Sequence, residues 1–255
     1  MRLCNGARQT AFSSAVAGLS AVSDGHWFDL AETAMTLKKP AMVLIDVDGT
    51  LVDSVPDLAF CVDEMMRQLG RPARGESAVR NWVGNGVERL VRRALVGQLD
   101  GEPSEADFDA AYPIFLELYA ANTSKRSLLY PGVIEGLDYL MAQGYKLGCV
   151  TNKAAQFTLP LLSALGIRDR FGIVVCGDTL PVKKPDPGPL LHAAAHFGVA
   201  PEAALMLGDS KSDVAAARAA GFGGAGAGAS DRSTPPDAIR ARTLKLKSII
   251  SISIE

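Results

Sequence analysis

The stretch DVDGT, residues 46–50, ends the first short apolar run of the sequence, residues 41–46. A run of this length without alternating polar side chains is typical of a strand buried on both faces of a parallel sheet. Ligands bind at the carboxyl ends of the strands in such a sheet. Asp46 and Asp48 are therefore predicted to face a ligand, one as a nucleophile and the other as a proton carrier. Taken alone, the stretch is also compatible with a simple strand end followed by a glycine turn.

Three further apolar runs have the same character, and helical stretches alternate with them. The predicted strands cover residues 41–46, 146–150, 173–176 and 204–207, and the predicted helices cover residues 133–143, 156–165, 187–197 and 212–220. A glycine follows each helix where a left-handed cap would lie, at Gly144, Gly166, Gly198 and Gly221. This alternation predicts an α/β fold with a doubly wound parallel sheet.

Residues 57–129 interrupt the alternation. Apolar residues recur at helical spacing in residues 58–69 and 87–95, and a third helix is expected at about residues 104–121, with a kink at Pro113. Helices without an intervening strand, placed directly after the first strand, predict an inserted helical cap. We therefore expect a cap at residues 57–129 and a catalytic core at residues 35–56 and 130–255.

Two other strand ends carry groups that suit a phosphate. Thr151 ends the second predicted strand, and its hydroxyl and nearby backbone amides suit a phosphate oxygen, with Asn152 beside it as a further candidate. Lys184 follows the third strand, where an ammonium would neutralise a nucleophile and a phosphoryl group together. A turn at residues 151–152 and a solvated lysine pair are the alternatives, and we favour solvation for Lys183.

The fourth strand ends in two more carboxylates, Asp209 and Asp213. Carboxylates that gather with Asp46 and Asp48 would repel one another unless a cation lay between them. Hard oxygen ligands beside a phosphate favour Mg²⁺ over Zn²⁺. We expect Asp209 to bind the metal directly and Asp213 to orient the site from behind the ligands.

Asp-x-Asp, Thr, Lys and Asp-x-x-x-Asp at successive strand ends resemble the haloacid dehalogenase superfamily, over residues 42 to about 222. The stretches DVDGTLVDSVPDL, WVGNG, LLYPGV, TNK, CGDTLP, KKPDP and GDSKSD closely resemble bacterial phosphoglycolate phosphatases. The resemblance implies a Rossmann-like core with a cap, and hydrolysis of 2-phosphoglycolate through an aspartyl-phosphate on Asp46. It implies that Asp48 is the acid and base. It also implies Mg²⁺ held by the Asp46 side chain, the Asp48 carbonyl and Asp209.

Substrate choice is expected to depend on the cap. Asn85 and Gly86, within the Gly84–Gly86 stretch, could bring backbone amides to the substrate, although a plain turn between helices is the alternative. Arg89, Arg92 and Arg93 could meet a substrate carboxylate, although arginines on a helix are commonly solvated. His192 and His196 have metal-pair spacing but lack the glutamate of a zinc protease, so we do not expect a metal there.

Composition excludes several classes of function. The chain has 255 residues, a net charge of −2 and no basic stripe, which argues against nucleic-acid binding. No apolar run approaches the roughly 20 residues that a membrane span needs. Four cysteines without a CxxC pair are expected to be reduced thiols of a cytoplasmic protein. The expected partner is a small phosphoester, and the expected state is a monomer or homodimer.

The two ends of the chain depart from this pattern. Residues 1–34 are expected to be an extension outside the fold, preceding a natural start at Met35. After Phe222 the resemblance implies an apolar fifth strand, but residues 223–229 contain only Gly and Ala, which weakens a strand. Residues 243–254 suit a strand but cannot be placed. The alternatives to phosphoglycolate are a sugar phosphate, nucleotide or pyrophosphate, or a non-catalytic binding protein of the same fold.

Overall fold

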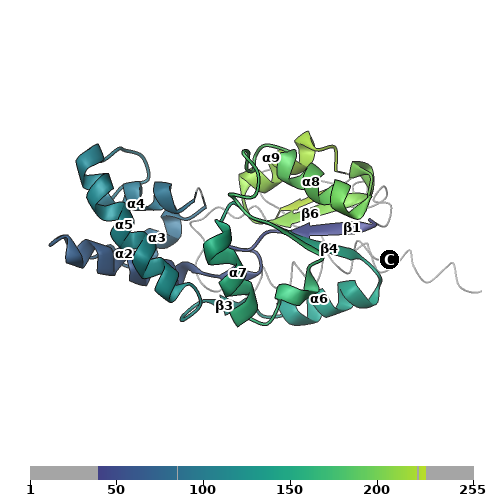
Figure 1. Cartoon of the computed structure of the whole chain (residues 1–255), viewed down its shortest axis with the longest axis horizontal. Coiled ribbons are helices and arrows are strands. Elements are labelled where there is room, and N and C mark those ends of the chain that lie inside the picture. The colour runs from purple at the N-terminus through teal and green to yellow at the C-terminus, as the bar shows by residue number, and fades with distance from the viewer. Residues whose placement is uncertain (1–39, 85, 223, 228–255) are drawn as a thin grey trace, which may run out of the picture. The chain divides into compact units, whose positions relative to one another are not determined.

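A computed structural model describes residues 40–84, 86–222 and 224–227. Within these residues, five parallel strands form one sheet in the order β5-β4-β1-β6-β7 (Figure 1). The strands are β1 (Met42–Ile45), β4 (Lys146–Val150), β5 (Ile173–Val175), β6 (Ala204–Gly208) and β7 (Gly224–Ala227). The first four match the predicted strands to within two residues. The expectations for residues 1–34, Asn85 and residues 243–254 lie outside the described part.

Helices cover both faces of the sheet, as the doubly wound prediction requires. They are α6 (Val133–Ala142), α7 (Ala155–Ala164), α8 (Gly188–Phe197) and α9 (Lys211–Ala219), with short 3₁₀ turns at Arg168–Arg170 and Pro201–Ala203. Val43 and Ile45 of β1 belong to the same buried cluster as residues of α6 and α7. Met42 and Leu44, which alternate with them, belong to a cluster with residues of α8 and α9. Figure 1 shows α8 and α9 on one face of the sheet and α6 on the other. The sheet is therefore buried on both sides.

The four glycines predicted to end the core helices all have positive φ. Gly144, Gly166, Gly198 and Gly221 have φ values of 79°, 68°, 62° and 73°. Residues with an L side chain rarely adopt this conformation, so the glycines fix where each helix ends and the chain turns toward the next strand.

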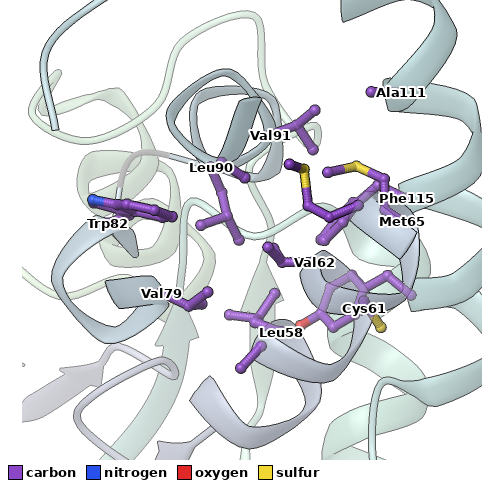
Figure 2. Packing of buried hydrophobic residues seen from close by; sticks show 14 of the residues in the cluster. Leu58, Cys61, Val62, Met65, Val79, Trp82, Leu90, Val91, Ala111 and Phe115 are labelled. Carbon is purple, nitrogen blue, oxygen red and sulfur yellow. The ribbon is translucent and has the colours of Figure 1, made fainter. Parts of the chain in front are cut away.

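The helices of the predicted cap form a second group with its own apolar cluster. They are α2 (Val55–Gln68), α3 (Glu76–Trp82), α4 (Val87–Val96) and α5 (Glu105–Asn122), and α5 continues through Pro113. Val62, Met65 and Phe115 are fully buried members of this cluster (Figure 2). The sequence did not predict α3, which is only seven residues long. A short antiparallel pair, β2 (Val52–Asp53) with β3 (Leu128–Leu129), joins the segments that enter and leave the group. The exact division into cap and core stays a prediction.

The glycine-rich segment forms a strand despite its composition. Gly224–Ala227 pairs in parallel with β6 at the edge of the sheet, with Leu205 opposite Gly224 and Gly208 opposite Ala227. This pairing is possible because a sheet ladder is made by backbone N–H and C=O groups, which glycine supplies as well as any residue.

Candidate active site

The predicted strand-end residues meet at one cavity. Asp46 and Asp48 follow β1, Thr151 follows β4, Lys184 follows β5, and Asp209 follows β6. All five line a cavity of about 620 Å³, together with residues from the α2–α5 group. The carboxyl ends of the strands therefore converge as the sequence predicted.

Lys184 joins two buried carboxylates. Its ammonium lies 3.0 Å from Asp46 Oδ1 and 2.6 Å from Asp213 Oδ1, and it donates to the Val150 carbonyl at 2.7 Å. Burial alone would lower the pKa of Lys184, but the two carboxylates raise it above its ordinary value. Lys184 is therefore a fixed positive charge at the base of the cavity, beside the predicted nucleophile.

Asp213 occupies a position set by its own helix. Its Oδ2 accepts from the backbone N–H of Ser210 at 3.0 Å and from the Ser210 hydroxyl at 2.6 Å, which completes a capping box at the start of α9. Its other oxygen faces Lys184. Both oxygens of Asp213 are thus engaged in hydrogen bonds or an ion pair.

The carboxylates form a group whose chemistry fits a divalent cation. Oxygens of Asp46, Asp209 and Asp213 lie within 4.8 Å of one another. Burial raises the pKa of Asp46 to about 7; Lys184 opposes this rise, whereas Asp213 and Asp209 add to it. A further positive charge nearby would favour the ionised form of Asp46. Carboxylate oxygens are the ligands that Mg²⁺ prefers, so these residues fit that ion.

Asp48 is held from two sides. The hydroxyl of Ser54 donates to Asp48 Oδ1 at 2.6 Å, and Lys153 Nζ lies 3.1 and 3.2 Å from the two carboxylate oxygens. Lys153 was missed in the sequence analysis, although it stands two residues after Thr151 in the quoted TNK stretch. A basic residue so close to a ligand-binding strand end was the signal that could have found it.

Thr151 and Asn152 shape the edge of the cavity between β4 and Lys184. The Thr151 hydroxyl accepts from the Lys153 N–H at 3.2 Å, and the Asn152 side-chain amide donates to the Lys184 carbonyl at 2.8 Å. The Asn152 side-chain oxygen is buried without a hydrogen-bond partner in the described structure. Asn152 is one of the residues that line the cavity.

The helical group contributes cations to the same cavity. Arg80, Arg89 and Arg92 line it, as does Gly86 at the start of α4. Arg89 and Arg92 also pair with Glu102. Arg93 does not belong with them: it is buried and donates to the carbonyls of Trp82, at 2.6 Å, and Leu99, at 3.0 Å. Its suggested contact with substrate was wrong, because its guanidinium satisfies carbonyls inside the helical group.

The remaining predictions concern Lys183, the histidines, the thiols and membranes. Lys183 is exposed, as expected, but lines the cavity. His192 and His196 are exposed on α8 and are not part of the acidic group that could hold a metal. The cysteines in the described part, at positions 61, 149 and 176, are buried free thiols. Among the described residues, none of the helices has the length and apolar character needed to cross a bilayer.

Comparisons with known proteins point to one family. A family model for haloacid dehalogenase-like hydrolases matches residues 40–221. The chain is 62% identical over 221 residues to a phosphoglycolate phosphatase of Nitrosococcus oceani, covering 84% of this chain and 98% of that protein. It is 49% identical over 179 residues to a phosphoglycolate phosphatase of Thiobacillus denitrificans, covering 70% and 79%.

A solved structure agrees with these sequence matches. The crystal structure of a predicted phosphoglycolate phosphatase from Haemophilus somnus superposes with a TM-score of 0.67 at 36% identity. The match covers 73% of this chain and 84% of that one.

Proposed function

The chain belongs to the haloacid dehalogenase-like hydrolase family, and from this premise we propose that it is a magnesium-dependent phosphatase that hydrolyses 2-phosphoglycolate. The proposal rests above all on the cavity where Asp46, Asp48 and Lys184 meet. The substrate follows from the relatives in Nitrosococcus oceani and Thiobacillus denitrificans that carry this activity in their names.

In the first step, a carboxylate oxygen of Asp46 attacks the phosphorus atom. The bond between phosphorus and the ester oxygen breaks, and Asp48 donates a proton to that oxygen, which leaves as an alcohol. An aspartyl-phosphate on Asp46 remains. Lys184, 3.0 Å from Asp46, offsets negative charge on the carboxylate and on the phosphoryl group.

In the second step, Asp48, now ionised, takes a proton from water. The resulting hydroxide attacks phosphorus, the bond from phosphorus to Asp46 breaks, and inorganic phosphate leaves. Asp46 regains its carboxylate and Asp48 its proton, so the net reaction consumes one water for each ester. The Thr151 hydroxyl and the nearby backbone N–H groups, including that of Asn152, are proposed to donate to the oxygens of the phosphoryl group.

Asp46, Asp209 and the backbone carbonyl of Asp48 are proposed to hold Mg²⁺, with Asp213 orienting the site. When bound, this ion supplies positive charge that neutralises the phosphoryl oxygens and aligns them with the nucleophile. Asp213 can hold Lys184 in place meanwhile, because its oxygens already face Lys184 and Ser210.

Recognition of the substrate carboxylate is assigned to the α2–α5 group. The strand-end residues suffice only for the phosphate, whereas Arg80, Arg89 and Arg92 of the α2–α5 group also line the cavity. Gly86 lines it as well, at the start of α4, and we retain Asn85 beside it as a proposed ligand from sequence alone.

We further propose a cytoplasmic enzyme that acts as a monomer or homodimer.

One observation favours a different phosphomonoester. A cavity of about 620 Å³ is larger than a two-carbon phosphoester requires, so a sugar phosphate or nucleotide is the second candidate. A non-catalytic binding protein is disfavoured because Asp46 and Asp48 are both present.

A screen of phosphorylated metabolites with Mg²⁺ separates these candidates. We expect 2-phosphoglycolate to give the highest kcat/KM among small phosphoesters. A sugar phosphate or nucleotide turned over about tenfold better, which corresponds to about 1.4 kcal/mol in transition-state binding, would overturn the substrate but not the phosphatase. No turnover of any ester would overturn both.

A further inference from the structure

Lys153 carries a buried ammonium group that has no role in the two steps above. Its side chain is 3% exposed, yet it carries a charge, which is costly in a protein interior unless it is paired. It meets both oxygens of Asp48, at 3.1 and 3.2 Å, and donates to the hydroxyl of Tyr119. Burial alone would lower the pKa of Lys153, but Asp48 and Tyr119 raise it above its ordinary value.

Tyr119 is itself fixed by packing. It belongs to α5, its side chain is fully buried, and its ring centroid lies 4.7 Å from that of Phe157 and 5.5 Å from that of Phe115. Such contacts leave the ring little freedom. The hydroxyl of Tyr119 is therefore a rigid acceptor for Lys153, supplied by a different segment of the chain from the one that carries Asp48.

The carboxylate of Asp48 is correspondingly restrained. Lys153 engages both oxygens, and the Ser54 hydroxyl donates to one of them at 2.6 Å. The Asp48 side chain remains 20% exposed and lines the cavity. It is thus held in one orientation while its open side faces the space where the substrate binds.

We propose that Lys153 is a positioning residue for Asp48, and that Tyr119 holds Lys153 in place. The inference rests on the proposed phosphatase function. Lys153 acts through Asp48: it keeps the carboxyl group aligned for proton transfer to the leaving oxygen and from the attacking water. The bond changes are those of the two steps above, and Lys153 keeps its own protons throughout.

A double-mutant cycle tests this role. Lys153→Met is made in the natural chain and in an Asp48→Asn background, and phosphate release from 2-phosphoglycolate is followed with Mg²⁺. Acid–base catalysis contributes about 10²- to 10⁴-fold, so loss of alignment should lower kcat by about 10- to 100-fold in the natural chain with little change in KM. In the Asp48→Asn background, the same substitution should cost less than about twofold, because its target is already gone.

The leaving group supplies a second readout. 2,4-Dinitrophenolate departs without needing a proton. The rate of the single-turnover burst of 2,4-dinitrophenolate from 2,4-dinitrophenyl phosphate should therefore fall less than about threefold in Lys153→Met. A residue that bound phosphate or merely maintained the fold would slow both esters equally. Equal losses for the two esters, or additive losses in the cycle, would overturn the assignment of Lys153.

Tyr119→Phe keeps the ring and removes only the hydroxyl, so it tests the inference even if Lys153→Met does not fold. Loss of one hydrogen bond should lower kcat for 2-phosphoglycolate by about 2- to 10-fold, with the same dependence on the leaving group. Tyr145→Phe, at a buried tyrosine in the cluster packed on the sheet, is the matched control and should leave kcat unchanged. Identical behaviour of the two variants would refute the role of Tyr119. If the natural chain hydrolyses neither ester, the proposed function fails instead.

Discussion

Asp57 is a buried carboxylate that ties together the segments entering and leaving the α2–α5 group. It lies in the first turn of α2, and its side chain is fully buried. It accepts from the backbone N–H groups of Arg126, at 2.9 Å, and Ser127, at 2.8 Å, and from the Ser127 hydroxyl at 2.7 Å. The two segments lie about 70 residues apart in sequence, so this contact closes a long loop.

Asp57→Asn should destabilise the protein strongly, although the asparagine side chain has nearly the same shape as that of aspartate. One oxygen becomes an NH₂ group that faces an N–H donor, so a hydrogen bond to a charged acceptor, worth about 1.5–3 kcal/mol, is lost. The Arg126 or Ser127 N–H is left unpaired, at a further cost of about 1–3 kcal/mol. Allowing for relaxation, we expect a loss of about 3 kcal/mol in unfolding free energy, which lowers Tm by about 6–12 °C.

The assay compares thermal unfolding of Asp57→Asn with that of Asp138→Asn. Asp138 is exposed and pairs with Arg170 at 2.8 Å, and such a surface pair contributes less than about 1 kcal/mol. Amide hydrogen exchange at residues 126 and 127 should accelerate only in Asp57→Asn. The reasoning about Asp57 is refuted if the two variants melt within about 2 °C of each other and these amides stay protected. Such a small difference in Tm would mean that Asp57→Asn lowers the unfolding free energy by about 1 kcal/mol or less.

Four other predictions concern the site and the chain start. Asp46→Asn should abolish turnover while leaving Tm intact, and normal turnover would remove Asp46 as the nucleophile. EDTA should stop hydrolysis and added Mg²⁺ restore it, whereas full activity in metal-free buffer would contradict the metal site. Gly208→Ala should lower kcat at least about tenfold and the unfolding free energy by about 1–3 kcal/mol. The new Cβ would lie 2.3 Å from Cγ of Asp213, so Asp213 must move away from Lys184. Unchanged kinetics would show that the contact between Asp213 and Lys184 is dispensable. A chain that starts at Met35 should keep activity and Tm, and a large fall in Tm would show that residues 1–34 stabilise the fold.

The strand ends could be predicted from sequence because a parallel sheet places them all at one edge. Asp46, Thr151 and Asp209 each follow an apolar run, and strand direction alone then brings them together. Lys184 could be predicted by the same argument, because it follows the third predicted strand and precedes Pro185, ahead of a helix. In each case the prediction depended on local sequence and one general property of the sheet.

The contacts of Lys153 and Arg93 could not be predicted in that way. Tyr119 falls on the buried face of α5, and the sequence does not reveal which residue its hydroxyl meets. Arg93 satisfies the carbonyl of Trp82, the last residue of α3, a short helix that itself went unpredicted. With only Val79 and Trp82 buried, that helix shows too few apolar residues for its period to stand out.

The edge of the sheet gives a last contrast between what side chains and backbone determine. Asp46 and Asp209 follow β1 and β6, which pair with each other through four successive residues in the middle of the sheet. Among the described strands, β7 lies outside them and pairs only with β6. The backbone pairing of β1 with β6 therefore does not involve β7. Because the spacing of Asp46 and Asp209 depends on that central pair, the sequence after Phe222 can depart from the family pattern and leave the catalytic geometry intact.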